Sequence, residues 1–190
     1  DRYVGNAFIF EPGDANKILS YNDKRDFKEL TRPYYEKIQG YDDVAKMQYI
    51  DFNFWLIGDI LLKADKMSMA NSLEVRVPFL DRPLISSVIN MPAKYKIVGN
   101  QTKYAFREVC KEALPEKWAS KKKLGFPVPI REWIKEEDVY NDIYEKFMGS
   151  EEFFKPKKII KLLEEHKNGK RDNSRKIWTI YSFLVWYQEY

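Results

Sequence analysis

Thr102, Lys103 and Arg107 are of types and at a spacing that could bind a phosphate. Residues 103–114 show helical spacing, and Thr102 precedes them as the expected N-cap. Unpaired N–H groups and the positive end of the helix dipole would attract a phosphate or pyrophosphate there, and two cations would add to that attraction. The alternative interpretation is two long side chains solvated at the surface, since exposed charges usually contribute little.

A second basic cluster contains Lys121, Lys122 and Lys123 and is followed by Gly125 and Phe126. The glycine and the prolines around it predict a loop. Such a loop could cover a phosphate or contact a nucleic acid. A loop that is merely basic and solvated would have the same sequence.

Other polar residues have structural interpretations. Glu74, Arg76 and Asp81 lie in or beside a segment that alternates between apolar and polar residues, so we expect an ion-pair network that fixes this segment. Asp51 and Asn53 fall in a helix that is otherwise apolar. There they must be paired internally or line a site.

Helices must position these side chains. Apolar spacing and capping residues predict helices over 23–40 with a break at 31–33, 42–57, 59–71, 82–90, 103–114, 130–148, 157–167 and after 172. Thr31 and Asp42 are the expected N-caps of the segments that follow them. The helix after Asp42 is apolar on nearly every side, which predicts burial at the centre of the fold. Residues 1–22 predict loops, and 72–79 predict an extended segment.

Composition limits the class of protein. The chain has 190 residues, 44% of them apolar, with a formal net charge of +4. These values predict a single-domain core, too balanced in charge for an obligate nucleic-acid or membrane-surface binder. The near absence of alternating strands predicts one mainly helical unit. The single cysteine, Cys110, and the single histidine, His166, exclude a disulfide framework or a Cys/His zinc site within this chain and suit the cytoplasm. No apolar run is long enough for a membrane span, and the start at Asp1 predicts a fragment of a longer protein.

One block of sequence carries a resemblance to a known family. Residues 59–81 read DILLKADKMSMANSLEVRVPFLD, which resembles the signature of the glutamine-hydrolysing asparagine synthetases. The resemblance continues through Thr102-Lys103 to KKLGFPVP at 122–129 and to Trp133, and it covers the whole chain. Lys66 departs from the pattern because the family often has arginine there, and a lysine cannot replace a bidentate arginine contact.

This resemblance implies a two-domain enzyme with an N-terminal glutaminase and an α/β synthetase domain of the adenine-nucleotide α-hydrolase-like (ATP pyrophosphatase) fold. Residues 1–190 would be the mainly α C-terminal portion of that domain, without the glutaminase and without the pyrophosphate-loop half. ATP would adenylate aspartate, and ammonia from glutamine would convert the aspartyl-AMP to asparagine. Lys103 matches the catalytic lysine of the family, and a fixed cation there would stabilise charge that develops on the phosphates.

The resemblance also implies roles for other residues. The candidate ligands of ATP or pyrophosphate are Thr102, Lys103, Arg107, Lys122 and Lys123. The signature would contribute a structural network made of Asp59, Asp65, Glu74, Arg76 and Asp81. No metal site is expected in this chain, and magnesium ligands are expected in the absent half. The fragment alone would be inactive, its partners would be aspartate, ATP, ammonia and the absent segments, and a homodimer stays open.

Two alternatives remain. Relatives that close β-lactam rings or amidate other carboxylates use the same acyl-adenylate chemistry, so the local motifs do not fix the acceptor. The second alternative is a non-catalytic helical module that contacts nucleic acid through 121–123 and Arg131. Its binding would weaken steeply as salt is added.

Overall fold

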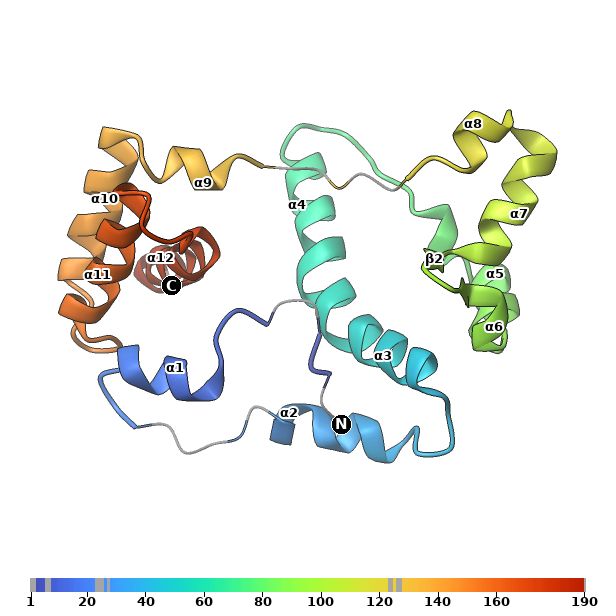
Figure 1. The fold of residues 1–190 in the computed structure, drawn as a ribbon, viewed down its shortest axis with the longest axis horizontal. Coiled ribbons are helices and arrows are strands. Elements are labelled where there is room, and N and C mark those ends of the chain that lie inside the picture. Colours follow the sequence, from blue (N-terminus) through green and yellow to red (C-terminus); the bar gives the residue numbers. More distant parts are fainter. Residues whose placement is uncertain are drawn as a thin grey trace. The chain divides into compact units, whose positions relative to one another are not determined.

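The computed structural model describes residues 3–5, 8–22, 26, 28–122, 125 and 128–189. It is mainly helical, as the sequence predicts, and the described residues include one two-stranded sheet (Figure 1). The chain forms two compact units, where its length and composition predicted one. The first unit contains Asp1–Asn6 and Leu30–Gly125, and the second contains Ala7–Glu29 and Phe126–Tyr190.

The first unit is built along one long helix. This helix runs through three consecutive segments, α3 (Asp43–Asp51), η1 (Phe52–Leu61) and α4 (Leu62–Met69), of which η1 is a π-helix. Asp42 caps its start as predicted, because the N–H of Ala45 donates to Asp42 Oδ1 at 2.8 Å. The predicted break at Gly58 is wrong, since Gly58 lies inside η1. A single glycine weakens a helix by about 1 kcal/mol and does not end it.

α2 (Lys28–Glu36) corrects a second prediction. Thr31 was expected to cap a helix with Pro33 in its first turn, but both residues lie inside α2. Thr31 is only 3% exposed, and Tyr35, one turn later on the same face, is 6% exposed. Burial of this face offsets the single backbone donor that the proline removes, so the helix continues.

A small core joins α2 to the long helix and consists of Tyr35, Ile38 and Ile50. The Tyr35 hydroxyl donates to the carbonyl of Tyr3 at 2.7 Å, and the Tyr3 hydroxyl donates to Asp51 Oδ1 at 2.6 Å. Burial and the Asp51 carboxylate raise the pKa of Tyr3. Asn53 donates to the carbonyl of Tyr49 at 2.8 Å. Asp51 and Asn53 are therefore paired internally, which was one of the two predicted possibilities.

The rest of the first unit is made of short elements. These are η2 (Pro78–Leu80, a 3-10 helix), α5 (Arg82–Ile89), α6 (Ala93–Lys96), β1 (Ile97–Val98), β2 (Gln101–Thr102), α7 (Tyr104–Ala113) and α8 (Glu116–Ala119). β1 and β2 are antiparallel, with Ile97 opposite Thr102. Gly99 has a φ of 55°, as a two-residue hairpin loop requires. Residues 73–77 form no ladder with any described strand and lead into η2.

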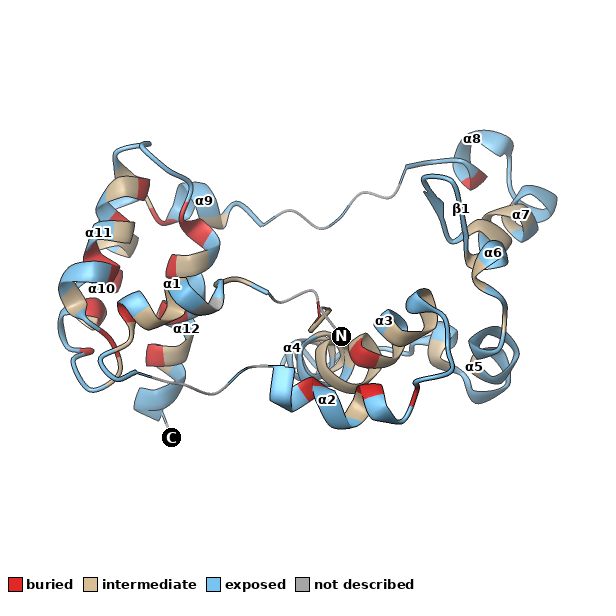
Figure 2. Ribbon diagram, turned by 60° about the horizontal axis from the view of Figure 1, so that its bottom comes forward, coloured by how far each residue is buried: buried red, intermediate tan, exposed pale blue. Residues whose placement is uncertain are grey.

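The second unit holds most of the buried side chains (Figure 2). Its helices are α1 (Pro12–Ile18), α9 (Ile130–Trp133), α10 (Glu137–Met148), α11 (Pro156–Lys167) and α12 (Ser174–Glu189). Their core includes Ile134, Ile143, Phe147, Ile159, Leu163 and Ile177, none more than 1% exposed. Phe153 makes edge contacts with the rings of Phe183 and Tyr187. This unit therefore has an ordinary apolar core of its own.

α1 contradicts the prediction that residues 1–22 form no stable element. Ile18 at its end is 8% exposed within the core of the second unit. Leu19 forms an isolated bridge with Phe154, and the N–H of Ser20 donates to the carbonyl of Phe153 at 2.9 Å. A helix this short is stabilised by such contacts rather than by its own sequence, so the turn signals alone were misleading.

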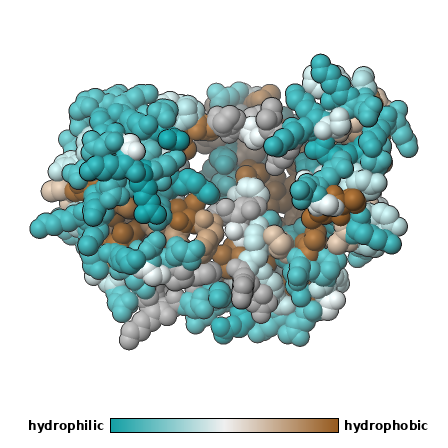
Figure 3. Space-filling view, viewed as in Figure 1, coloured by the Kyte–Doolittle hydropathy of each residue, from teal (hydrophilic) through white to brown (hydrophobic). Residues whose placement is uncertain are grey.

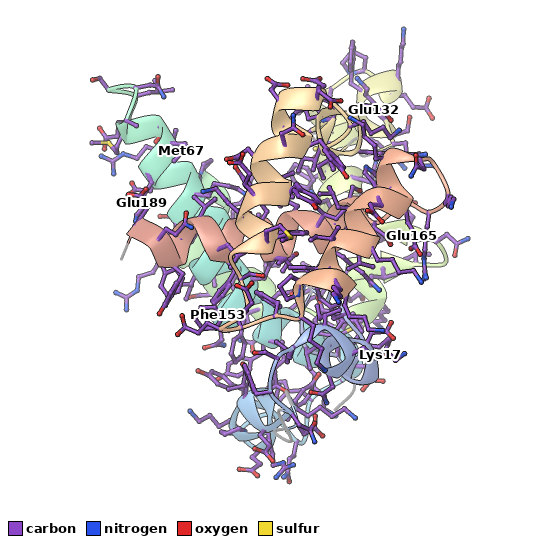
Figure 4. The ribbon with its side chains drawn as sticks, turned by 90° about the vertical axis from the view of Figure 1, so that its left-hand side faces the viewer. Lys17, Met67, Glu132, Phe153, Glu165 and Glu189 are labelled. Atoms are coloured by element: carbon purple, nitrogen blue, oxygen red, sulfur yellow. The ribbon has the colours of Figure 1, made fainter. Side chains whose placement is uncertain are left out.

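The first unit exposes much apolar surface. The sequence predicted that η1 is buried on all sides, but no residue of η1 is buried and Ile57 is 62% exposed. Met67, labelled in Figure 4 near the end of α4, is 60% exposed. Phe79 in η2 is 63% exposed. Apolar side chains reach the surface in the space-filling view as well (Figure 3). Within the described part of the chain, no helix combines the length and apolar character needed to cross a membrane.

Candidate phosphate-binding site

Lys103 lies where the hairpin meets α7, and it occupies the N-cap position itself. Its carbonyl accepts the first hydrogen bond of the helix, from the N–H of Arg107 at 3.0 Å. Thr102 was the predicted cap, and this is wrong because Thr102 belongs to β2 and pairs with Ile97. The strand passes into the helix through a single residue, so no separate capping residue remains between them.

The backbone of Lys103 is in the left-handed region, with φ 59° and ψ 35°. For a residue with a side chain this conformation costs about 1–2 kcal/mol. Strained backbone of this kind is concentrated at functional sites, where the surrounding structure holds it in place. The side chain of Lys103 is exposed, and no described acidic residue forms a salt bridge with it. The amine is thus available to an anion.

Arg107 lies one turn after Lys103 and is half-buried. Its guanidinium donates to backbone carbonyls: Nε to Thr102 at 3.2 Å, and Nη1 to Ala119 at 3.1 Å and to Lys121 at 2.9 Å. Arg107 lies inside α7 and Lys103 is the N-cap of that helix, so the direct binding of phosphate by Arg107 stays a prediction. The bonds to Ala119 and Lys121 had no signal in the sequence, because carbonyl acceptors are present at every residue.

The basic loop begins at the end of α8 and is joined to α7 through Arg107. The Lys121 ammonium lies over the ring of Trp118, 4.9 Å from its centroid. Lys122 is exposed, and no described carboxylate pairs with it. Lys123, also predicted as a ligand, lies outside the described residues. The Arg107 guanidinium therefore joins the backbone just before Lys103 to the backbone at Lys121, the residue before Lys122.

The signature residues form pairs rather than one network. Asp59 accepts hydrogen bonds from Trp55 Nε1 at 3.1 Å and from Lys63 Nζ at 3.3 Å. Glu74 and Arg76 pair with each other at 2.5 Å, and both are mostly exposed, so the pair adds little stability.

The remaining signature carboxylates stand apart from these pairs. Asp81 precedes α5 without a capping bond from its side chain. The carbonyl of Asp65 accepts from Ser68 Oγ at 3.1 Å. In the described ranges, no cluster of three or more His, Cys, Asp or Glu side chains could hold a metal ion.

Comparison with known proteins places this chain in a family. The sequence model named Asparagine synthase matches residues 7–188. The chain belongs to the asparagine synthase family. Both the signature segment 59–81 and the basic residues around α7 fall inside the matched range.

Curated members of the asparagine synthase family match nearly the whole chain. Asparagine synthetase [glutamine-hydrolyzing] 1 of Bacillus subtilis is 44% identical over 191 residues, which cover 98% of this chain and 30% of that protein. A putative asparagine synthetase [glutamine-hydrolyzing] of Mycobacterium tuberculosis is 38% identical, over 98% of this chain and 29% of its own length. This chain thus spans about a third of these relatives. No solved structure matches it significantly.

Proposed function

We propose that the protein containing this chain makes asparagine from aspartate, ATP and ammonia released from glutamine. Membership of the asparagine synthase family and the names of the two relatives support this activity. The reaction consumes ATP and belongs in the cytoplasm. The chain would be the helical C-terminal part of the synthetase domain, which agrees with the share of the relatives that it spans.

The proposed chemistry explains why a fixed amine is needed. An aspartate carboxylate oxygen bonds to the α-phosphorus of ATP, and the bond from that phosphorus to the bridging oxygen breaks. The electron pair leaves with pyrophosphate, so negative charge grows on the departing oxygens. Ammonia then attacks the acyl carbon of aspartyl-AMP, and AMP leaves. A cation beside the departing oxygens lowers the barrier to the first step because its attraction grows in the transition state.

Lys103 is the residue that carries this proposal. Its exposed amine, held at a strained N-cap at the start of α7 and unpaired with any described carboxylate, is the single observation that supports phosphate binding here. Lys122 and Lys123 would add positive charge from the adjacent loop. Thr102 and Arg107 complete the predicted set: Thr102 directly precedes Lys103, and Arg107 donates to the carbonyls of Thr102 and Lys121, the residues before Lys103 and Lys122.

The proposal assigns the other parts of the reaction to the rest of the protein. The described residues offer no acidic cluster for magnesium, so we place the metal that accompanies ATP elsewhere. The exposed apolar side chains of the first unit support contacts with further polypeptide, since a surface of this kind marks an interaction site. The isolated chain is therefore expected to be inactive.

The full-length protein allows a direct test of the substrate. Purified protein is incubated with ATP, magnesium and ammonium, and the release of AMP and pyrophosphate is followed with and without aspartate. Release that requires aspartate, with one asparagine formed per pyrophosphate, supports the proposal. Release of AMP and pyrophosphate with another carboxylic acid, and none with aspartate, would assign a different acceptor.

The nucleic-acid alternative has a separate test. Binding of random oligonucleotides at low salt, lost steeply as salt rises, would favour the helical binding module. Our proposal expects no such binding, because the net charge of the chain is only +4.

A further inference from the structure

We propose that Arg107 is a positioning residue that fixes segment 119–122, which joins the end of α8 to the basic loop, beside Lys103. This inference rests on the proposed function, in which lysines at these two places bind the phosphates of ATP. Arg107 would act on the nucleotide through the two segments that it joins rather than by gripping a phosphate itself.

The contacts of the guanidinium link two parts of the chain that are distant in sequence. Nε donates to the carbonyl of Thr102, the residue before Lys103, at 3.2 Å. Nη1 donates at 2.9 Å to the carbonyl of Lys121, the residue before Lys122. The same Nη1 also donates at 3.1 Å to the carbonyl of Ala119, the buried end of α8. One rigid, planar group thus fixes the backbone on the N-terminal side of both lysines.

Only an arginine can make this set of contacts. Its donors point in fixed directions within one plane, and hydrogen bonds from a charged donor are roughly twice as strong as neutral ones. A lysine at the same position keeps the positive charge but presents a single mobile ammonium group. It could not hold Thr102 and Lys121 at once.

The charges around Arg107 indicate that Arg107 holds the backbone in place, while the neighbouring lysines bind an anion. No described carboxylate forms a salt bridge with Arg107, Lys103 or Lys122, whereas Lys111 on the same helix pairs with Glu108 at 2.7 Å. Like charges held together repel one another unless an anion joins them. The hydrogen bonds of Arg107 would therefore hold a cationic cluster in place before a polyphosphate binds.

Charge and hydrogen-bond geometry are separated by comparing Arg107→Lys with Arg107→Met in the full-length protein. Lys111→Met, which removes one positive charge from the outer face of the same helix, is the matched control. Steady-state kinetics give KM for ATP, KM for aspartate and kcat for asparagine formation, and glutamine hydrolysis is measured separately. We expect both Arg107 variants to raise KM for ATP at least fivefold, with KM for aspartate and glutamine hydrolysis within twofold of the wild type.

Limited trypsin digestion without nucleotide supplies a readout that does not depend on activity. Cleavage after Lys121 and Lys122 is quantified by mass spectrometry, and circular dichroism checks that the variants fold. We expect at least fivefold faster cleavage there in both Arg107 variants, and no change in Lys111→Met or Lys103→Met. Faster cleavage in the Arg107 variants, together with wild-type asparagine formation by Lys103→Met, would support the role of Arg107 in holding the loop and reject the proposed function.

Two outcomes would overturn the inference. Wild-type KM for ATP and wild-type cleavage in Arg107→Lys, with loss only in Arg107→Met, would show that Arg107 acts through its charge. Unchanged cleavage in both variants would show that the loop is held by other contacts.

Discussion

The left-handed backbone of Lys103 predicts that a residue with a side chain at this position lowers the free energy of unfolding. Replacing Lys103 with glycine removes the Cβ atom that makes φ 59° unfavourable. Replacing it with alanine removes the same amine and keeps the strain. The two variants therefore separate the backbone conformation of residue 103 from the chemistry of its side chain.

The expected difference follows from two opposing effects. Glycine relieves about 1–2 kcal/mol of left-handed strain. Its extra freedom in the unfolded chain costs about 0.4–1 kcal/mol. The Lys103→Gly protein should thus be more stable than Lys103→Ala by about 1 kcal/mol, or about 2–4 °C in Tm for a domain of this size. Lys103→Asn should lie between them, because asparagine tolerates this conformation better than alanine.

Differential scanning calorimetry of the full-length protein measures these differences, with asparagine formation assayed on the same samples. Lys111 supplies the control, since it lies inside α7 where glycine is unfavourable. Lys111→Gly should be less stable than Lys111→Ala by about 1 kcal/mol, the opposite order. All three Lys103 variants should lose asparagine synthesis regardless of their stability. A Lys103→Gly protein that is no more stable than Lys103→Ala would refute the strained conformation.

Three further predictions concern the framework. Phe147 is fully buried at 0% exposure, so Phe147→Ala should cost about 3–5 kcal/mol in urea unfolding, and a near-wild-type midpoint would contradict the core described for the second unit. Asp42→Ala should lower the free energy of unfolding by about 1 kcal/mol and Asp42→Asn by much less, unless the bond to Ala45 contributes nothing. Burial and the hydrogen bond to Asp142 raise the pKa of Tyr181 from 10.0 to about 12. The stability from this shift is complete below pH 10 and is lost between pH 10 and about 12, so Tyr181→Phe should flatten the decline, and an equal decline in both proteins would exclude it.

Local chemistry made some of the fold predictable. Asp42 could be identified as a cap because its carboxylate needs only the N–H groups of the next turn. The ends of α5 and α7 were predictable from apolar spacing that stops before Pro92 and Pro115, although neither helix has a side-chain capping bond at its start. Signals of this kind act within one turn and do not depend on the rest of the protein.

The predictions from the sequence were wrong where contacts between distant residues decide the structure. Gly58 weakens a helix and Pro33 removes one of its backbone donors, but each lies inside a helix that neighbouring turns and packing sustain. α1 depends on a bridge from Leu19 to a residue far along the chain. The apolar sequence of η1 predicted burial, but Ile57 is exposed among the described residues. The prediction failed because a sequence pattern shows that a helix face is apolar but not which residues cover it.

The sequence selects candidate residues for the site but not their geometry. Charge and spacing make Lys103 and Arg107 candidates, and the resemblance of segment 59–81 indicates the reaction. The left-handed N-cap could not be foreseen, because an αL lysine depends on the hairpin before it. The carbonyls of Ala119 and Lys121 likewise become partners of Arg107 only after folding.

In our proposal, the amine of Lys103 stabilises charge on the phosphates of ATP during activation of the carboxylate. This role is tested by the rate of aspartate-dependent pyrophosphate release by full-length Lys103→Met, measured beside glutamine hydrolysis in the same preparation. We predict a loss of pyrophosphate release on the order of a hundredfold to a thousandfold, with glutamine hydrolysis retained. Pyrophosphate release at the wild-type rate would contradict the role of Lys103.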